Sequence, residues 1–301
     1  MTILVMCLVA NVTLFLSGGN PSPRRFVAAD ESHGCVRYID EADPTRSFAV
    51  PVTKPAWNLT RLAPGEYRVV GGSGYEVVRL SERRVARRFQ HPALKGITAL
   101  ADWPDGGFIA CVEAGKIVRF PRFDAAGRHV ATYVCAEIFD PSNMRRTGSD
   151  ELAVAWERGF VRLRVPAAVA HGTDPTTPIP LTPFADVRQP GGRNGFDAVP
   201  TRDGTGWWLT TGYSTRLCRF DNAGKLVSSW TAELGPGLKN TFYAQIQESA
   251  DGLVYLAQWN GHRATDGAKG WQALAFDAQG RVAWHFHDPN MGSFDGFDLL
   301  P

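Results

Sequence analysis

Short runs of alternating apolar and polar residues, separated by turn residues, recur along the chain. Three segments share Phe-Asp, two further residues, Gly and a basic residue: RFDAAGRHVATY at 122–133, RFDNAGKLVSSW at 219–230 and AFDAQGRVAWHF at 275–286. An alternating run, a tight turn and a second alternating run predict two antiparallel strands. We expect the Asp side chain to bond the backbone of its own turn, and the Gly to take a positive φ.

Two further strands are predicted in front of most of these copies. The segments at 57–72, 97–112, 196–212 and 242–258 each contain two apolar runs joined by a turn that contains Gly. Four strands in a meander, repeated six times, are typical of the blades of a β-propeller. The sequence therefore predicts an all-β fold, a six-bladed β-propeller of four-stranded antiparallel blades.

The two ends of the chain each carry part of a blade. SFDGFDLLP at 293–301 matches an innermost strand without a second strand, and NVTLFLSGG at 11–19 matches a second strand without an innermost one. A propeller closes its ring because an unpaired edge strand would otherwise face solvent. We therefore expect the N- and C-terminal strands to share one blade. Within residues 20–52, either RRFVAAD at 24–30 or CVRYID at 35–40 is the third strand of that blade.

The remaining irregular segments change this prediction little. Residues 1–10 are apolar but too short to span a bilayer, so they form either a lead-in to the first strand or the remnant of a signal peptide. Residues 11–301 are expected to form a single propeller domain. The stretch at 166–192 is rich in Pro, which confines any strand there to the edge of a sheet.

The last blade and a half resemble a known group of propellers. QWNGHRATDGAKGWQALAFDAQGRVAWHFHDP at 258–289, followed by FDLLP at 297–301, resembles the closing section of bacterial six-bladed propellers related to the quinoprotein-like and NHL-like repeats. The copy at 275–284 is similar to the quinoprotein repeat, although it is one residue short at the turn. The resemblance covers nearly the whole chain at the level of fold. It implies an architecture and not a reaction, because propellers host enzymes, sensors and scaffolds alike.

Charge and cysteine content exclude some classes of partner. The 32 Lys and Arg residues nearly balance the 30 Asp and Glu residues, so no overall field favours nucleic acid. The five cysteines are scattered without metal-ligand spacing, and we interpret most of them as small apolar residues within strands. We expect a monomer without cofactor, bound metal or membrane span.

Candidate ligand-binding residues gather in the loops expected at one face of the ring. These loops are rich in Trp, Asn, Arg and Gly, and aromatic faces beside amide and guanidinium groups suit a sugar or another planar polar ligand. The alternative is that they only cap blade ends. The candidates are Trp57, Asn58, Arg193, Asn194, Asp197, Tyr243, Trp259, Asn260, His262 and Asp295.

Three functions stay open at this point. The first is a non-catalytic propeller that binds a small polar ligand, a glycan or a protein loop at this face. The second is a metal-dependent lyase or lactonase-type enzyme that uses channel carboxylates, with Glu113 as a candidate ligand. The third is a protein-interaction scaffold. Asp197 and Asp295 follow Phe at equivalent positions, and we favour bonding to neighbouring backbone over a paired-carboxylate site. No GxSxG, HExxH or Walker motif supports a common enzyme class.

Overall fold

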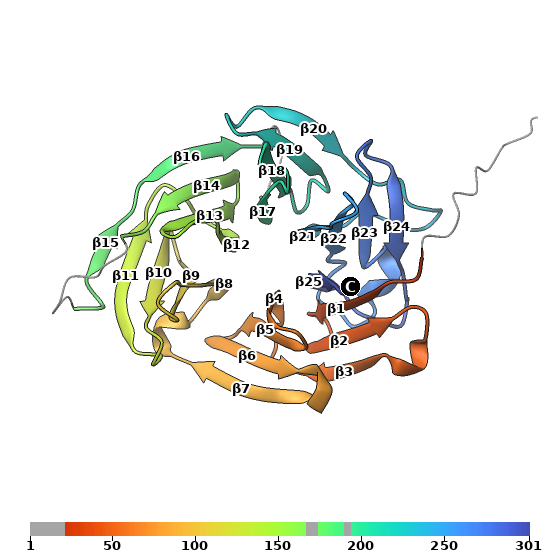
Figure 1. The fold of residues 1–301 in the computed structure, drawn as a ribbon, viewed down its shortest axis with the longest axis horizontal. Coiled ribbons are helices and arrows are strands. Elements are labelled where there is room, and N and C mark those ends of the chain that lie inside the picture. The colour runs from red at the N-terminus through yellow and green to blue at the C-terminus, as the bar shows by residue number, and fades with distance from the viewer. Residues whose placement is uncertain (1–21, 167–173, 190–193) are drawn as a thin grey trace, which may run out of the picture.

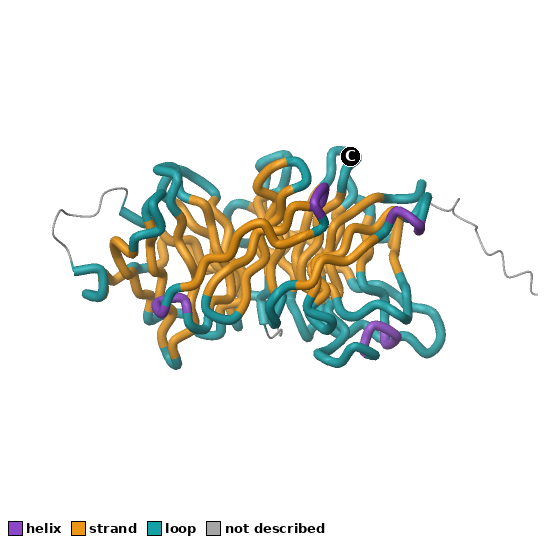
Figure 2. The backbone as a smooth tube through the Cα atoms, turned by 90° about the horizontal axis from the view of Figure 1, so that it is seen from below, coloured by secondary structure: helices purple, strands orange, loops and turns teal. Residues whose placement is uncertain are grey.

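The chain forms a ring of six β-sheets around a central channel (Figure 1). The computed structural model describes residues 22–166, 174–189 and 194–301. Seen from the side, the ring is a flat disc with loops on both faces (Figure 2). The predicted all-β six-bladed propeller is confirmed. Blades are numbered here from the first complete one.

The first three blades run from β4 to β16. Blade 1 contains β4 (Trp57–Ala63), β5 (Glu66–Gly71), β6 (Gly74–Arg79) and β7 (Arg84–Gln90). Blade 2 contains β8 (Ile97–Asp102), β9 (Phe108–Ala114), β10 (Ile117–Phe123) and β11 (His129–Cys135). Blade 3 contains β12 (Pro141–Arg146), β13 (Glu151–Trp156), β14 (Gly159–Arg164) and β16 (Pro183–Arg188).

The other three blades complete the ring. Blade 4 contains β17 (Asp197–Pro200), β18 (Gly206–Thr210), β19 (Leu217–Asp221) and β20 (Leu226–Trp230). Blade 5 contains β21 (Tyr243–Glu248), β22 (Val254–Gln258), β23 (Ala273–Phe276) and β24 (Val282–Phe286). Blade 6 contains β25 (Phe294–Leu299), β1 (Arg25–Asp30), β2 (Cys35–Asp40) and β3 (Phe48–Pro51). Short 3-10 helices are η1 (Pro44–Arg46), η2 (Leu80–Glu82), η3 (Pro92–Leu94) and η4 (Asp266–Lys269).

Blade 6 closes the ring with strands from both ends of the chain. β25 pairs antiparallel with β1, which confirms that N- and C-terminal strands share one blade. The second strand is β1, however, and not the predicted 11–19, which lies outside the described residues. The reason is burial, because a second strand packs on both faces and five consecutive residues of β1 are buried. The third strand is therefore β2.

Blade 2 carries an additional short strand at its outer edge. β15 (Pro178–Pro180) leaves blade 3 between β14 and β16 and pairs in parallel with β11. Proline has no backbone NH to give to a ladder, so it is tolerated at an edge. The predicted edge position of this Pro-rich stretch is confirmed.

The repeated Asp-Gly turns form as the sequence predicts. Asp124, Asp221 and Asp277 each accept hydrogen bonds from the backbone NH groups two and four residues later, at 2.9–3.0 Å. The glycine of each turn has a positive φ, which costs glycine little: 76° at Gly127, 80° at Gly224 and 76° at Gly280. These turns fix the pairing of the third and fourth strands in blades 2, 4 and 5.

The hydrophobic core lies within and between the blades. In blade 6, Phe26 is fully buried and its ring lies 5.1 Å from that of Phe297 and 5.7 Å from that of Trp284 in blade 5. The four cysteines of the described ranges are buried in strands, as interpreted from the sequence: Cys35, Cys111, Cys135 and Cys218. No helix within the described ranges has the length and hydropathy to cross a membrane.

Candidate functional site

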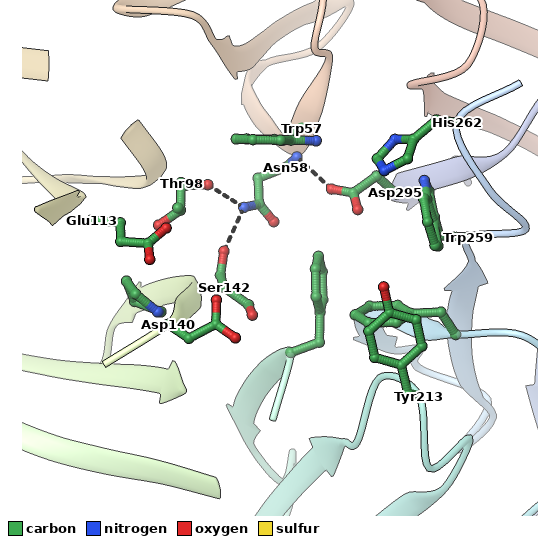
Figure 3. A pocket seen from close by; sticks show the side chains of 13 residues that line it. Trp57, Asn58, Thr98, Glu113, Asp140, Ser142, Tyr213, Trp259, His262 and Asp295 are labelled. Carbon is green, nitrogen blue, oxygen red and sulfur yellow. Dashed lines mark hydrogen bonds between the residues drawn. The ribbon is translucent and has the colours of Figure 1, made fainter. Parts of the chain in front are cut away.

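A pocket of about 210 Å³ opens at one mouth of the channel (Figure 3). All six blades contribute to it, through innermost strands, the residues just before them, one second strand and the loops that follow second strands. Because the ring brings these segments together, residues far apart in sequence face a single cavity. The lining residues are Trp57, Asn58, Thr98, Glu113, Asp140, Pro141, Ser142, Phe196, Tyr213, Phe242, Trp259, His262 and Asp295.

Four aromatic rings form one wall of this pocket. Phe242 lies at the centre, with ring-centre distances of 4.7 Å to Tyr213, 5.2 Å to Phe196 and 5.7 Å to Trp259. The interplanar angles of 77–87° are the edge-to-face geometry that aromatic quadrupoles favour. Phe196 and Phe242 are buried, whereas Tyr213 at the rim is 61% exposed. The exposed part of this wall, Tyr213 and the half-buried Trp259, offers a ligand apolar surface.

Asn58 lies at the pocket floor and connects three other blades. Its Nδ2 donates to the carbonyl oxygens of Thr98 at 2.5 Å and Ser142 at 3.1 Å, and its backbone NH donates to Asp295. The residue adopts a left-handed φ of 44°, which an asparagine tolerates better than most residues. Its Oδ1 is buried and has no hydrogen-bond partner among the described residues. A buried acceptor left without a donor costs free energy that a ligand or water recovers.

Three carboxyl groups face the same cavity. Burial raises the pKa of Asp295 to about 7, with smaller contributions from the charges of Glu31 and Asp197, while the NH of Asn58 acts in the opposite direction. The side chain of Glu113 is exposed overall, but partial desolvation of its carboxyl and then the charge of Asp140 raise its pKa. No Lys or Arg is among the described residues that line the pocket. The cavity is therefore rich in acceptors and acidic.

Glu31 holds two lining residues in place from behind. The residue follows β1 and is 7% exposed. Its Oε2 accepts a hydrogen bond from Trp259 Nε1 at 3.2 Å, and its Oε1 lies 3.2 Å from His262 Nδ1. Glu31 was not predicted from the sequence, because it stands in a turn without any motif.

Five of the ten sequence candidates line the pocket together. These residues come from blades 1, 5 and 6: Trp57, Asn58, Trp259, His262 and Asp295. Figure 3 shows Trp57, His262 and Trp259 around the end of the pocket that holds Asp295. Their convergence was expected, and whether they bind a ligand stays a prediction.

Two other candidates, Asn194 and Asn260, support the site or the fold without lining the cavity. Asn194 donates from Nδ2 to Asp140 Oδ2 at 3.0 Å and so restrains that carboxylate. Asn260 is buried and donates to the carbonyl oxygens of Gly270 and Trp271, which organises the loop between β22 and β23. Arg193 lies outside the described residues.

Tyr243 does not lie at the mouth as expected. Its side chain is fully buried between blades 4 and 5, and its hydroxyl accepts from the NH of Ala232 at 2.9 Å and donates to Asn240 Oδ1 at 3.2 Å. Neighbouring residues of an extended chain point to opposite sides, so Phe242 faces the pocket instead.

Asp197 and Asp295 each bond the backbone of the next blade. Asp197 Oδ2 accepts from the NH of Ile246 at 2.9 Å, and Asp295 Oδ2 accepts from the NH of Asn58 at 3.1 Å. Asp197 also forms an ion pair with Arg145, with Oδ2 2.6 Å from Nη2. The favoured interpretation, bonding to neighbouring backbone, is thus confirmed for both. Only Asp295 lines the pocket as well.

Several lining residues escaped sequence reasoning. Phe196 and Phe242 begin predicted strand segments and Tyr213 directly follows one, but the sequence does not show which aromatic residue faces the channel. Asp140 and Ser142 fall in the least regular part of the repeat. Within the described ranges, no group of three or more His, Cys, Asp or Glu side chains is placed to hold a metal ion.

No family model and no curated protein matches this sequence. Solved structures match its fold. A protein of unknown function from Bacteroides caccae superposes with a TM-score of 0.69 at 15% identity, over 93% of this chain and 99% of that one. A protein from Lactobacillus plantarum gives a TM-score of 0.58 at 12% identity, over 93% and 100%. A chain of a nidogen–laminin complex gives 0.64 at 9% identity, over 92% and 98%. Identities this low establish the propeller fold alone.

Proposed function

We propose that this protein is a non-catalytic binding propeller that holds a small polar ligand in the pocket at the channel mouth. One observation carries the proposal: the unpartnered Oδ1 of Asn58 and a half-open aromatic wall converge on the same cavity. Each feature costs free energy in the empty protein, and each is relieved by a ligand that supplies a donor and an apolar face.

The size of the cavity limits what it holds. At about 210 Å³ it lies below the usual range of about 300 to 1,000 Å³ for pockets that enclose drug-sized ligands. A single sugar unit, a small metabolite or one side chain from a partner's loop fits this volume. Glycan and protein-loop binding are thus forms of the same proposal, in which one unit enters the pocket.

Tyr213 provides the most selective test. Its ring is 61% exposed, so removing it costs the fold little, while its contact with Phe242 places it on the aromatic wall. A thermal-shift screen of small polar compounds should compare the wild-type protein with Tyr213→Ala. Phe184→Ala is the matched control, because Phe184 is 44% exposed on β16, an outer strand. The proposal predicts stabilising compounds whose effect disappears in Tyr213→Ala and persists in Phe184→Ala.

Two other results of this screen would contradict the proposal or change its test. If every stabilising compound acts on Tyr213→Ala as on the wild-type protein, the pocket is not the binding site. If Tyr213→Ala by itself unfolds the protein, the ring belongs to the core, and Glu113→Gln, which changes an exposed side chain of the pocket, replaces it as the test.

The relationship to the quinoprotein-like and NHL-like repeats is part of the same proposal. The three Asp-Gly turns with their carboxylate-capped NH groups support it, since they recur at the same place in three blades.

A further inference from the structure

The pocket is electrostatically one-sided. Apart from His262 and the phenol of Tyr213, its ionisable lining groups within the described ranges are the carboxyls of Glu113, Asp140 and Asp295. His262 is largely exposed, and its Nδ1 lies 3.2 Å from Glu31 Oε1. Any positive charge on this imidazole is therefore paired with the Glu31 carboxylate. Figure 3 shows Glu113 and Asp140 together at one side of the pocket, with Tyr213 and Trp259 at the other.

The polar floor also presents acceptors in preference to donors. Asn58 uses its Nδ2 on two carbonyl groups of neighbouring blades and directs its unpartnered Oδ1 to the cavity side, as Figure 3 shows. Trp259 uses its indole NH on Glu31. Trp57 and His262 still offer ring NH groups, and the hydroxyl groups of the lining both donate and accept. A ligand that satisfies Asn58 Oδ1 and the three carboxyl groups must nevertheless donate hydrogen bonds.

The aromatic wall further limits the kind of ligand that the pocket can bind. The faces of Trp and Tyr rings attract cations through their quadrupole, and this attraction strengthens when the cation leaves water. An anionic ligand is poorly matched to this pocket, because it would meet carboxylates and, at the wall, the electron-rich faces of aromatic rings.

We propose that the ligand of this pocket is a small organic cation, a protonated amine whose hydrocarbon part packs on the wall of Phe196, Tyr213, Phe242 and Trp259. The ammonium group donates to Asn58 Oδ1 and Asp295 and is neutralised by Glu113 and Asp140. This inference rests on the proposed function, because it names the chemical class of the ligand at the same site.

The experiment compares benzylamine with benzyl alcohol, which share the ring and its methylene group and differ in the ammonium and hydroxyl groups. Binding is measured by isothermal titration at pH 8 with EDTA present, so that a metal ion does not mediate it. An alkyl amine is protonated at this pH. We expect benzylamine to bind at least about tenfold more tightly than the alcohol, a difference equal to about 1.4 kcal/mol.

Two variants link this preference to the carboxyl groups. Glu113→Gln changes an exposed side chain, and Asp295→Asn keeps an oxygen that accepts from the NH of Asn58. Each should reduce the affinity for benzylamine severalfold and leave that for benzyl alcohol nearly unchanged. Glu137→Gln, at an exposed residue just beyond β11, is the control and should change neither affinity.

Each alternative result overturns the inference in a distinguishable way. If both compounds bind equally and Tyr213→Ala abolishes both, the pocket binds neutral ligands, so the cation inference fails while the proposed function stands. If benzylamine binds equally to the wild-type protein and to both carboxyl variants, it binds elsewhere. If neither compound binds at millimolar concentration, the cation inference fails, and the screen with Tyr213→Ala decides the proposed function alone.

Discussion

At the scale of the residue, Asn58 serves both the ring and the pocket. One side-chain amide bonds carbonyl groups of blades 2 and 3, while its backbone NH bonds Asp295 of blade 6. The same residue leaves Oδ1 at the cavity floor without a hydrogen-bond partner among the described residues. An arrangement that only closed the ring would not require a buried acceptor without a donor.

Substitutions at Asn58 separate its conformational role from its bonding role. Asn58→Gly tolerates the left-handed φ of 44° but loses both side-chain hydrogen bonds, and should cost about 2 kcal/mol. Asn58→Ala loses the same bonds and adds backbone strain of about 1 kcal/mol. Urea unfolding of both variants measures the difference. Equal stability of the two would show that the left-handed conformation carries no cost here.

The Asp295 carboxyl predicts a specific dependence on pH. Its pKa of about 7 lies above the value of about 3.9 in an unfolded chain, so the folded protein binds this proton more tightly. The stability it contributes is full below about pH 4 and is lost as the pH rises toward 7 and above. A shift of this size corresponds to a few kcal/mol in all.

Asp295→Asn provides the measurement. Relative to the wild-type protein, this variant should gain stability by urea unfolding as the pH rises from 5 to 8, because an amide does not titrate. Glu31 and Asp197, whose charges help to raise the pKa of Asp295, are present in both proteins, so the difference between the two isolates the Asp295 carboxyl. A constant difference between the two proteins would contradict the raised pKa.

At the scale of the element, local pattern and local structure agree. The Asp-Gly turns, the alternation of the strands and the Pro-rich edge strand all depend on residues close together in sequence, and all were predicted. The partner of β25 was not, because 11–19 and 24–30 are both short apolar runs and only packing against other blades distinguishes them. The sequence also does not decide between Tyr243 and Phe242. Neighbouring residues of a strand point to opposite sides, so an error of one residue in the predicted register exchanges the residue in the core with the residue that faces the channel.

The Asp-Gly turns allow a direct test at this scale. Asp221→Ala removes both hydrogen bonds from the turn NH groups of Ala223 and Lys225, and should destabilise the protein by about 1 to 2 kcal/mol. Asp221→Asn keeps an acceptor and should cost less. Thermal unfolding compares the two. If both variants match the wild-type protein, the turn is maintained by its glycine alone.

At the scale of the whole molecule, blade 6 holds the ring closed. Phe294 and Phe297 of β25 are buried beside Phe26, and Asp298 forms an ion pair with Arg61 of blade 1. Each large apolar side chain contributes about 1.5 to 3 kcal/mol through burial. The closing strand therefore stabilises two blades and not only its own.

Deleting residues 293–301 should sharply lower the melting temperature. The truncation exposes the inner edge of β1 and removes both buried phenylalanines of β25. Deleting the exposed Pro301 alone is the control and should change little. An unchanged melting curve after the longer deletion would reject closure by this strand.

The most direct test is to determine which of the nine tryptophans lie close to a bound ligand. Trp57 and Trp259 line the pocket, and the other seven lie outside its lining. The indole NH signals of protein labelled with ¹⁵N at tryptophan, assigned by single Trp→Phe substitutions, should be recorded while the strongest compound from the thermal-shift screen is added. We predict saturable shifts of the Trp57 and Trp259 signals and only small shifts of the other seven. Shifts confined to the other tryptophans would contradict this prediction.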